Sequence, residues 1–188
     1  GVRFRITPES FYQVNHDGAE LLYGIAKQKA TQGFDKKIKL VDMYCGTGTI
    51  GLSMSDVCEE LVGVEIVEGA VECAKVNAWL NGFENAKFYA GDAKDIESLF
   101  SSVEAQHGVL NPDVVVLDPP RKGCTPEVIR FLNERGINHI VYVSCDPDTL
   151  ARDCKMFCDL GYTIGDVDPV DMFPRTGHIE NVVCLTRR

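Results

Sequence analysis

The sequence has no long apolar run and no apolar leader. None of its segments approaches the roughly 20 consecutive apolar residues that a membrane-spanning helix needs. Its first residues, GVRFRI, do not combine a charged segment with the apolar stretch of a secretory signal. These absences argue against a membrane protein and favour a cytoplasmic one. The missing initiator Met leads us to expect that the 188 residues are a fragment of a longer chain.

The sequence also lacks the paired Cys-x-x-Cys spacing of zinc sites and redox centres. Its eight cysteines fall within apolar runs or helical patterns, at positions 45, 58, 73, 124, 145, 154, 158 and 184. Cys154 and Cys158 are four residues apart on a predicted helix, but no second ligand pair has a spacing suitable for a metal. We therefore expect reduced thiols and no bound metal.

Positive charge is scarce. The 19 Lys and Arg residues are outnumbered by 28 Asp and Glu residues, which gives a formal net charge of −9. Binding to a polyanion normally depends on Lys and Arg, so this balance argues against a nucleic-acid surface spread over the chain. Hydrophobic residues make up 45% of the sequence, enough for one core at this length, and we predict a single domain over residues 1–188.

Short β-branched runs alternate with helical patterns from about residue 38 onward. The runs predicted as strands are 38–43, 61–66, 86–89, 114–117 and 140–143. The helices predicted between and after them are 50–57, 68–80, 94–105, 126–135 and 149–160. This alternation predicts an α/β fold with a mostly parallel, doubly wound, Rossmann-like sheet.

The two ends of the chain depart from this alternation. Segments 162–167 and 181–185 are strand-like and are joined by a loop, 168–180, without a helix, so we predict that they are antiparallel. The predicted sheet then has seven strands and an antiparallel terminal strand. Residues 1–35 are predicted to form a loop and a helix, whose apolar face carries Ala19, Leu22 and Ala26.

A glycine-rich turn follows the first predicted strand. The segment DMYCGTGTIG at 42–51 leads from this strand into a helix, and glycines such as Gly46 and Gly48 let a ligand approach the backbone. Glu65 ends the second strand about 20 residues later, where an acid can accept hydrogen bonds from both ribose hydroxyls. Asp92 follows the third strand and is a candidate to contact the adenine amino group. The pattern indicates a nucleotide-type ligand, either a dinucleotide or S-adenosylmethionine.

Two further strand ends carry reactive groups. The fourth strand ends in LDPPRKG (117–123), which places Asp118 and a proline-stiffened loop at the ligand-binding edge of the sheet. The fifth strand ends in VSCDP (143–147), which places the Cys145 thiol at the same edge, just before a predicted helix, where the thiolate can be favoured. Amino-group methyltransferases commonly have an Asn and an aromatic residue where this chain has Asp118 and Arg121, so N-methylation is disfavoured.

Five segments follow one another in an order that is more specific than any one of them. They are FYQVN (11–15), DMYCGTGTIG (42–51), DPPRKG (118–123), SCDPDTLAR (144–152) and DMFPRTGHIE (171–180). Together they resemble the bacterial RNA uracil-5-methyltransferase family over nearly the whole chain. The resemblance implies the class I S-adenosylmethionine-dependent methyltransferase fold. It also implies a cofactor site for S-adenosylmethionine lined by Gln13, Tyr44, Gly46, Gly48, Thr49, Glu65, Asp92 and Asp118.

The resemblance implies that Cys145 is the nucleophile and Glu180 the general base in methyl transfer to C5 of a uridine. Uracil C5 is a poor nucleophile until a thiolate adds to C6, and the adduct must afterwards lose its C5 proton to a base. From the residues alone, His178 is an alternative base, because it lies two positions from Glu180. Tyr44 and Asp146 replace a Phe and an Asn that are common in the family, and both changes are compatible with this chemistry.

The DMFP and TGH segments resemble the 23S ribosomal RNA branch of the family more than the tRNA branch. Ribosomal RNA is therefore the expected partner and 5-methyluridine the expected product. The family's N-terminal RNA-binding barrel precedes the matching region, and the resemblance implies that RNA affinity depends largely on it. Four local cations are expected to help, namely Arg121, Lys122, Arg152 and Arg175.

Other functions share parts of this pattern. An NAD-dependent oxidoreductase would also have the glycine turn and Glu65, but it would not explain Cys145 and Glu180 at the ligand edge. A non-catalytic module that binds S-adenosylmethionine or RNA would keep the fold without needing those two side chains. Within the family, a tRNA uracil-5-methyltransferase is the alternative.

Overall fold

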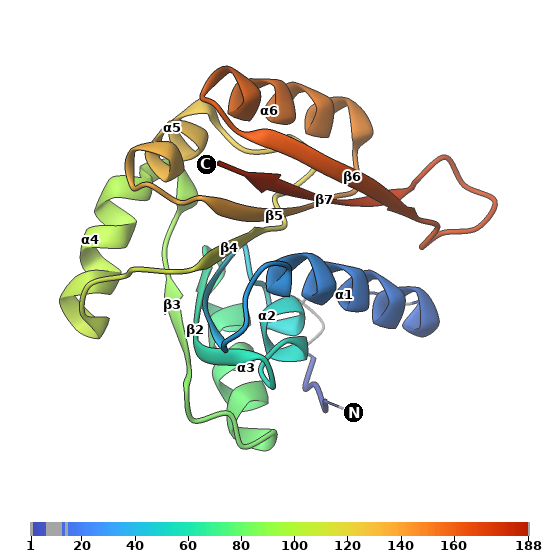
Figure 1. The fold of residues 1–188 in the computed structure, drawn as a ribbon. Coiled ribbons are helices and arrows are strands. Elements are labelled where there is room, and N and C mark those ends of the chain that lie inside the picture. Colours follow the sequence, from blue (N-terminus) through green and yellow to red (C-terminus); the bar gives the residue numbers. More distant parts are fainter. Residues whose placement is uncertain (1, 7–12, 14, 188) are drawn as a thin grey trace.

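The computed structural model describes residues 2–6, 13 and 15–187, and its centre is a seven-stranded sheet with the strand order β3-β2-β1-β4-β5-β7-β6 (Figure 1). The strands are β1 Ile38–Met43, β2 Cys58–Glu65, β3 Ala86–Ala90, β4 Val114–Leu117, β5 His139–Ser144, β6 Thr163–Val170 and β7 Glu180–Thr186. Strands β1 to β5 pair in parallel, whereas β7 is antiparallel to both β5 and β6. The predicted mostly parallel sheet with an antiparallel terminal strand is confirmed.

Helices cover both faces of the sheet (Figure 1). One face is covered by α4 (Ile96–His107), α5 (Pro126–Glu134) and α6 (Pro147–Asp159), and the other by α1 (His16–Thr31), α2 (Thr49–Ser53) and α3 (Glu68–Leu80). A short 3-10 turn, Ala93–Asp95, precedes α4. Every residue of β4 and β5 is buried, as expected for the β-branched central strands of a parallel sheet.

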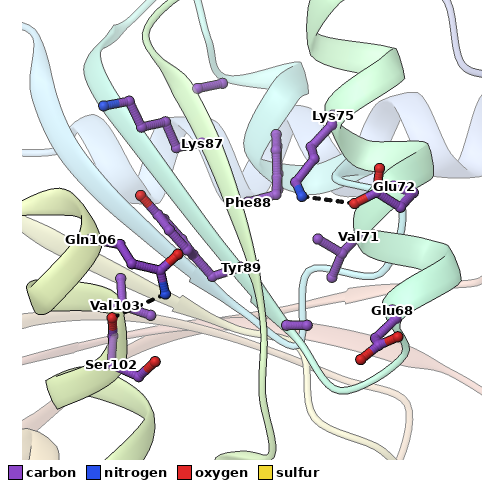
Figure 2. A pocket seen from close by; sticks show the side chains of 12 residues that line it. Glu68, Val71, Glu72, Lys75, Lys87, Phe88, Tyr89, Ser102, Val103 and Gln106 are labelled. Carbon is purple, nitrogen blue, oxygen red and sulfur yellow. Dashed lines mark hydrogen bonds and ion pairs between the residues drawn. The ribbon is translucent and has the colours of Figure 1, made fainter.

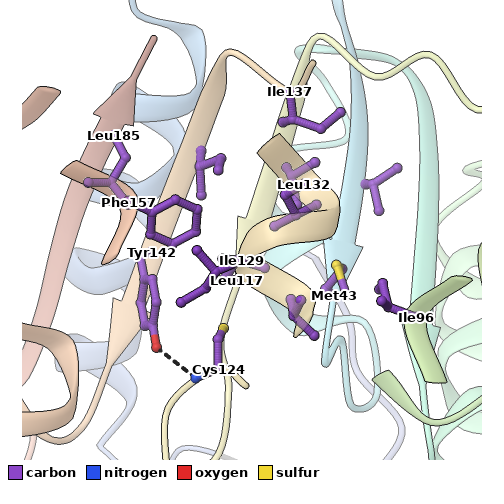
Figure 3. Close-up of a cluster of buried hydrophobic side chains, with 14 of the residues drawn as sticks. Met43, Ile96, Leu117, Cys124, Ile129, Leu132, Ile137, Tyr142, Phe157 and Leu185 are labelled. Atoms are coloured by element: carbon purple, nitrogen blue, oxygen red, sulfur yellow. Dashed lines mark hydrogen bonds between the residues drawn. The ribbon is translucent and has the colours of Figure 1, made fainter. Parts of the chain in front are cut away.

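The core beneath α4, α5 and α6 fixes the central strands in place. Leu117 and Tyr142 of the sheet belong to one cluster with Ile129 of α5 and Phe157 of α6 (Figure 3). All four side chains are fully buried, and burial of an apolar side chain of this size contributes roughly 1.5–3 kcal/mol. The ends of β4 and β5, which carry Asp118 and Cys145, therefore start from a rigid base.

Several predicted boundaries differ from the structure by one to three residues, among them the start of β2, which is Cys58 and not 61. The ends of β6 and α2 have a physical explanation. β6 continues to Val170, so the loop before β7 spans 171–179 and the predicted loop, 168–180, was too long. Pro169 is tolerated because β6 is an edge strand, whose outer side needs no backbone donor. α2 ends well before residue 57, because bonds from Met54 N to Gly51 O and from Ser55 N to Leu52 O tighten the chain into turns.

The predicted N-terminal helix is α1, and Asn15 caps it. Asn15 Oδ1 accepts a hydrogen bond from Gly18 N at 3.1 Å, the usual N-cap arrangement. α6 starts in the same way, since Asp146 Oδ1 accepts a hydrogen bond from Thr149 N at 3.0 Å and Pro147 occupies the first turn. Within the described part of the chain, no helix combines the length and the apolar character that crossing a bilayer requires.

Candidate active site

The predicted site residues gather at one edge of the sheet. β4 and β5 are parallel, so their carboxyl ends lie side by side and are followed by Asp118 and Cys145. β7 runs in the opposite direction and therefore starts at this same edge, with Glu180. The register pairs Ser144 with Asn181, which places Cys145 next to Glu180. Residues 35 positions apart in the sequence thus meet because of the antiparallel last strand.

The turn between β1 and α2 uses backbone conformations that favour glycine. Gly46 and Gly48 have φ angles of 54° and 82°, and Tyr44 before them has a φ of 64°. A side chain at Gly48 would be crowded, since its Cβ would lie 3.1 Å from both Leu52 and Phe88. A Cβ at Gly46 would meet no described atom within 4 Å. The Gly46 backbone is therefore accessible to a ligand.

Glu65 at the end of β2 sets the shape of this turn. Its Oε2 accepts a hydrogen bond from Gly46 N at 3.0 Å, and its Oε1 accepts one from Val67 N at 2.9 Å. A carboxylate offers about four acceptor positions, so about two remain for other donors such as ribose hydroxyls. Glu65 is half-buried and fits the predicted ribose contact.

Asp42, inside β1, supports the same turn from the protein interior. It is fully buried, and its Oδ2 accepts a hydrogen bond from Gly51 N at 2.9 Å. Burial raises the pKa of the Asp42 carboxyl to about 7, the bond from Gly51 opposes this shift, and the charge of Glu65 adds to it. Gly51 is needed here, because a Cβ would lie 2.8 Å from the Asp42 carboxylate.

Three buried polar atoms have no hydrogen-bond partner among the described residues: Gln13 Oε1, Asp42 Oδ1 and Thr47 Oγ1. An unpaired buried polar group is unfavourable by about 1–3 kcal/mol, so such atoms commonly face a polar ligand. Thr47 lies between the two glycines of the turn, Asp42 lies beneath it in β1, and Gln13 is a residue of the predicted cofactor site. Together with Glu65 they fit a ligand that contains adenosine.

The other predicted cofactor residues lie around the turn. Thr49 is the first residue of α2 and is half-buried. Asp92 follows β3, and its charge is one of those that raise the pKa of the Tyr44 hydroxyl. Burial is the largest cause of that shift, because Tyr44 packs against the core next to Cys124. Three residues of the FYQVN segment lie outside the described residues, namely Phe11, Tyr12 and Val14.

One thiol and two carboxyl groups form the centre of the site. Cys145 is half-buried, and burial, followed by the charges of Glu180 and Asp118, raises the pKa of its thiol. Glu180 is 6% exposed, and burial raises the pKa of its carboxyl. The Asp118 residue is half-buried, yet protein atoms surround its carboxyl group, and this desolvation, followed by Glu180 and Asp42, holds its pKa well above the usual range. Clustered acids with shifted pKa values are typical of catalytic sites.

Arg121 is the cation of this centre. Its charge opposes the upward shift of the pKa of both Cys145 and Glu180. Its Nη2 lies 3.4 Å from His178 Nδ1 and 3.5 Å from His178 Nε2. His178 is exposed and contacts this guanidinium, whereas Glu180 is buried next to Cys145. Of the two candidate bases, Glu180 is therefore the better placed to take a proton close to the thiol.

The four cations expected to help with RNA differ in their surroundings. Arg121, Lys122 and Arg175 are exposed. Arg152 is exposed as well, with half of its side chain accessible, but it also donates hydrogen bonds to the Asp153 carboxylate and to two carbonyl oxygens of residues 122 and 124. Its contact with RNA stays a prediction.

The eight cysteines are free thiols. Cys154 is buried and Cys158 is exposed, so the two do not share one environment on α6. Over the described ranges, no three His, Cys, Asp or Glu side chains are grouped so as to hold a metal ion.

A groove of about 630 Å³ runs along the edge strand β3, between α3 and α4 (Figure 2), as far as Ala90 at the end of that strand. Glu72 and Lys75 of α3 form an ion pair of 2.7 Å on one wall, and Tyr89 and Gln106 lie on the other side. None of the predicted site residues lines this groove. It is a separate surface feature.

Comparison with known proteins identifies the family of this chain. The model of the tRNA (uracil-5-)-methyltransferase family matches residues 1–188. This chain belongs to that family. An uncharacterised RNA methyltransferase from Clostridium acetobutylicum is 45% identical over 98% of this chain and 39% of its own length. Another from Bacteroides thetaiotaomicron is 46% identical over 100% of this chain and 40% of its own. The chain therefore spans about two fifths of the length of these curated relatives.

Solved structures show the fold of this uracil-5-methyltransferase family member. The tRNA (uracil-54, C5)-methyltransferase of Pyrococcus abyssi, in complex with S-adenosyl-L-homocysteine, has a TM-score of 0.78 and 33% identity over 97% of this chain and 42% of that one. A precorrin-6y C5,15-methyltransferase from Geobacter metallireducens has a TM-score of 0.74 over 98% of this chain and 94% of that one. At 13% identity, it shows a shared fold alone. The class I methyltransferase fold is confirmed, and the family membership argues against an NAD-dependent oxidoreductase.

Two residues that shape the site of this uracil-5-methyltransferase family member, Asp153 and Tyr142, were not predicted from the sequence. Asp153 lies on the buried face of α6 with Leu150 and Phe157. An acid among apolar residues at helical spacing indicates a buried partner, and this signal was available. Tyr142 stands within an apolar strand, where the sequence gives no indication that its hydroxyl has a specific role.

Proposed function

We propose that this domain catalyses the S-adenosylmethionine-dependent methylation of C5 of a uridine in RNA, through a covalent bond between Cys145 and C6. The observation that carries the proposal is the strand register that sets Cys145 next to Glu180, with Asp118 and Arg121 close enough to shift the pKa of the thiol. Membership of the uracil-5-methyltransferase family supports the same activity.

The residues around the glycine turn would hold the cofactor. S-adenosylmethionine supplies an electrophilic methyl group when it is bound. Gly46 lets the backbone approach it, Gly48 allows the turn to pack closely on Leu52 and Phe88, and Glu65 retains acceptor positions for the ribose hydroxyls. The other proposed contacts are Gln13, Tyr44, Thr49, Asp92 and Asp118. The relative from Pyrococcus abyssi, which was solved with S-adenosyl-L-homocysteine, supports this choice of cofactor.

Cys145 would start the reaction as a thiolate. The thiol lies just before the N-terminal end of α6, and the charge of Arg121 favours its ionised form against burial and the two acids. The sulfur forms a bond to C6, and the π electrons of the C5–C6 bond move toward O4. C5 becomes nucleophilic as a result.

Glu180 would complete the reaction as the general base. Once C5 is methylated, it still carries its original proton. Glu180 removes that proton, the C5–C6 double bond re-forms, and the Cys145 sulfur leaves as a thiolate. The raised pKa of the Glu180 carboxyl makes it a stronger base than an ordinary glutamate, while Arg121 keeps its ionised form accessible.

We propose 23S ribosomal RNA as the substrate and tRNA as the second candidate, both of which would be met in the cytoplasm. The resemblance of the DMFP and TGH segments to the ribosomal branch supports the first. The 33% identity to an archaeal tRNA enzyme supports the second. With a net charge of −9, this domain would depend on the rest of the protein for much of its RNA affinity.

The test uses the full-length protein, S-adenosylmethionine and RNA that contains 5-fluorouridine. Fluorine at C5 cannot leave as a proton, so the adduct with Cys145 should persist on a denaturing gel and in peptide mass spectra. Ribosomal RNA and tRNA transcripts are offered separately, and the one that forms the adduct identifies the substrate. Cys158→Ala is the matched control, because Cys158 is an exposed thiol at the far end of α6.

Loss of the adduct in Cys145→Ala but not in Cys158→Ala is the expected result. An adduct at another cysteine would show that the nucleophile is wrongly assigned. No adduct with either RNA, while S-adenosylmethionine still binds, would favour a non-catalytic module or methylation at another atom.

A further inference from the structure

The loop between β4 and α5, residues 118–125, carries Arg121 at the tip of a tight turn. Gly123 N donates a hydrogen bond to Pro120 O at 2.8 Å, so Arg121 and Lys122 are the two central residues of this turn. The turn is attached to the protein by Asp153 and Arg152 of α6 and by Tyr142 of β5.

Asp153 is the centre of these contacts. Its side chain is fully buried although it carries a carboxylate. Its Oδ2 accepts hydrogen bonds from the Tyr142 hydroxyl at 2.6 Å and from Cys124 N at 2.8 Å. Figure 3 shows the Tyr142 hydroxyl reaching the Cys124 backbone from the sheet side. A buried carboxylate is stable only where donors surround it, and here one of those donors is the backbone of the loop itself.

Arg152 connects the same carboxylate to the loop carbonyls. Its Nε lies 2.9 Å and its Nη2 2.8 Å from Asp153 Oδ1. The Nη2 also donates hydrogen bonds to Lys122 O at 2.7 Å and to Cys124 O at 3.3 Å. A planar guanidinium can make these contacts together, which a single ammonium group cannot do.

The packing between this pair and the loop leaves no room for a side chain at Gly123. Gly123 has a φ of 72°, and a Cβ there would lie 2.4 Å from Asp153 Oδ2 and 2.7 Å from Arg152 Nη2. The turn therefore packs directly against Asp153 and Arg152, and these two side chains set its position.

We infer that Asp153, Arg152 and Tyr142 form a positioning unit that holds Arg121 against Cys145 and Glu180. None of the three needs to touch the substrate. The inference rests on the proposed function in one respect, since it takes Cys145 and Glu180 as the reacting pair. It also explains why an arginine near the RNA-facing edge is bonded to the protein's own loop.

The unit acts on the thiol through Arg121. The charged groups that face Cys145 are Glu180 of β7 and Asp118 and Arg121 of the β4–α5 loop, and only Arg121 among them lowers the pKa of the thiol. A turn released from Asp153 would let Arg121 move away. The thiolate would then be less populated at neutral pH.

The test measures the rate of alkylation of Cys145 by iodoacetamide against pH, in the full-length protein without RNA or cofactor, by peptide mass spectrometry. Arg152→Gln and Tyr142→Phe each weaken the unit, and Tyr142→Phe does so without a change in charge. Arg121→Gln is the reference for loss of the cation. Lys155→Gln is the matched control, because Lys155 is an exposed residue of α6 that pairs with Asp159. Labelling is expressed as the alkylated fraction of the Cys145 peptide.

We expect Arg152→Gln and Tyr142→Phe to move the alkylation profile to higher pH and to slow labelling at neutral pH by about threefold to tenfold, since tenfold corresponds to one pKa unit. The shift should follow the direction of Arg121→Gln, and Lys155→Gln should match the unaltered protein. In the double variant Arg121→Gln/Arg152→Gln, the second change should add little, because it acts through a side chain that is already gone.

Three results would each overturn the inference. The first is a normal profile in Tyr142→Phe and Arg152→Gln while Arg121→Gln is shifted, the second is additive shifts in the double variant, and the third is an unshifted Arg121→Gln. Because alkylation needs neither RNA nor methyl transfer, these results are distinct from a failure of the proposed methylation. Thermal melting of each variant verifies folding, and Tyr142→Phe serves if Arg152→Gln does not fold.

Discussion

At the residue scale, the acids of the site hold their protons more tightly than ordinary carboxyl groups do. Burial is the largest cause for Asp42, Asp118 and Glu180, and mutual repulsion adds to it for Asp42 and Asp118. Asp42, with a pKa of about 7, is therefore partly protonated at neutral pH, which lowers the negative charge beneath the glycine turn. This would suit the proposed reaction, in which the site accepts an anionic RNA.

The clearest prediction for a single residue concerns Glu180. In Glu180→Gln, Cys145 should still attack C6, but the C5 proton has no base to accept it. We expect turnover to fall by on the order of 100-fold or more and the covalent protein–RNA species to accumulate on ordinary, non-fluorinated RNA. A denaturing gel quantifies this species. Glu97→Gln, an exposed change on α4, should behave like the unaltered enzyme, and normal turnover in Glu180→Gln would show that another group is the base.

The raised pKa of the Asp42 carboxyl predicts that the stability of the protein depends on pH. Its pKa is about 7 in the folded protein and near 3.8 in the unfolded chain, so between these values the folded state holds a proton that the unfolded state releases. The free energy of unfolding should therefore fall as pH rises from about 4 to about 7. In Asp42→Asn this part of the decline disappears.

Urea denaturation of Asp42→Asn and the unaltered protein at pH 5, 6 and 7 measures the difference. We expect the variant to lose about 1–2.5 kcal/mol less stability across this range, because the limit for one proton over two pH units is about 2.7 kcal/mol. Equal slopes for the two proteins would mean that Asp42 is ionised in the folded state throughout.

At the scale of elements, the sequence predicts best what depends on local periodicity. β1, β4 and α3 have the predicted bounds, since each is a continuous apolar or amphipathic run with a turn at both ends. The predicted end of β6, at residue 167, was wrong. Val170 belongs to the strand because it pairs with Glu180 of β7. A partner strand, which no local pattern reveals, decides that boundary.

The same distinction between local patterns and long-range contacts applies to the site. The strand ends that carry Asp118 and Cys145 follow from the alternation of strands and helices. The Asp153 contacts with Cys124 could not be derived, because they join residues 29 positions apart through side-chain geometry. Asn15 and Met172, 157 positions apart, give a second example, since Asn15 Nδ2 donates a hydrogen bond to Met172 O at 3.0 Å.

This last contact predicts that Asn15 serves two elements at once. It caps α1 through Oδ1 and anchors loop 171–179 through Nδ2. Asn15→Asp keeps the capping oxygen and loses the donor, so stability should change little while turnover falls several-fold, because the loop leads to Glu180. Asn15→Ala loses both functions and should also lower stability by about 1 kcal/mol.

Thermal melts and single-turnover rates separate the two effects. Glu20→Gly is the matched control, since it weakens the same helix by about 1 kcal/mol at an exposed position without touching the loop. We expect this control to lower stability and leave the rate unchanged. Full activity in Asn15→Asp would show that the anchor to Met172 plays no part in the reaction.

At the scale of the whole molecule, the positions of the charged residues matter more for the proposed RNA contact than the net charge does. The net charge of −9 would repel RNA, yet Arg121, Lys122 and Arg175 are all exposed on loops at the edge that holds Cys145 and Glu180. Under the proposed function, a few cations at that edge would orient an RNA segment, and the rest of the protein would supply most of the affinity. The acidic remainder of the surface would keep other RNA segments away from this domain.

Salt dependence tests this arrangement, because each phosphate contact releases counterions and steepens the decline of affinity with salt. In the full-length protein, Lys122→Gln/Arg175→Gln should lower the slope of log affinity against log KCl concentration by about one per cation removed. Lys37→Gln, an exposed change just before β1 and therefore at the opposite edge of the sheet, should leave the slope unaltered. If both variants had the same slope as the unaltered protein, the cations near Cys145 would not contact phosphates, and RNA would reach the site by another path.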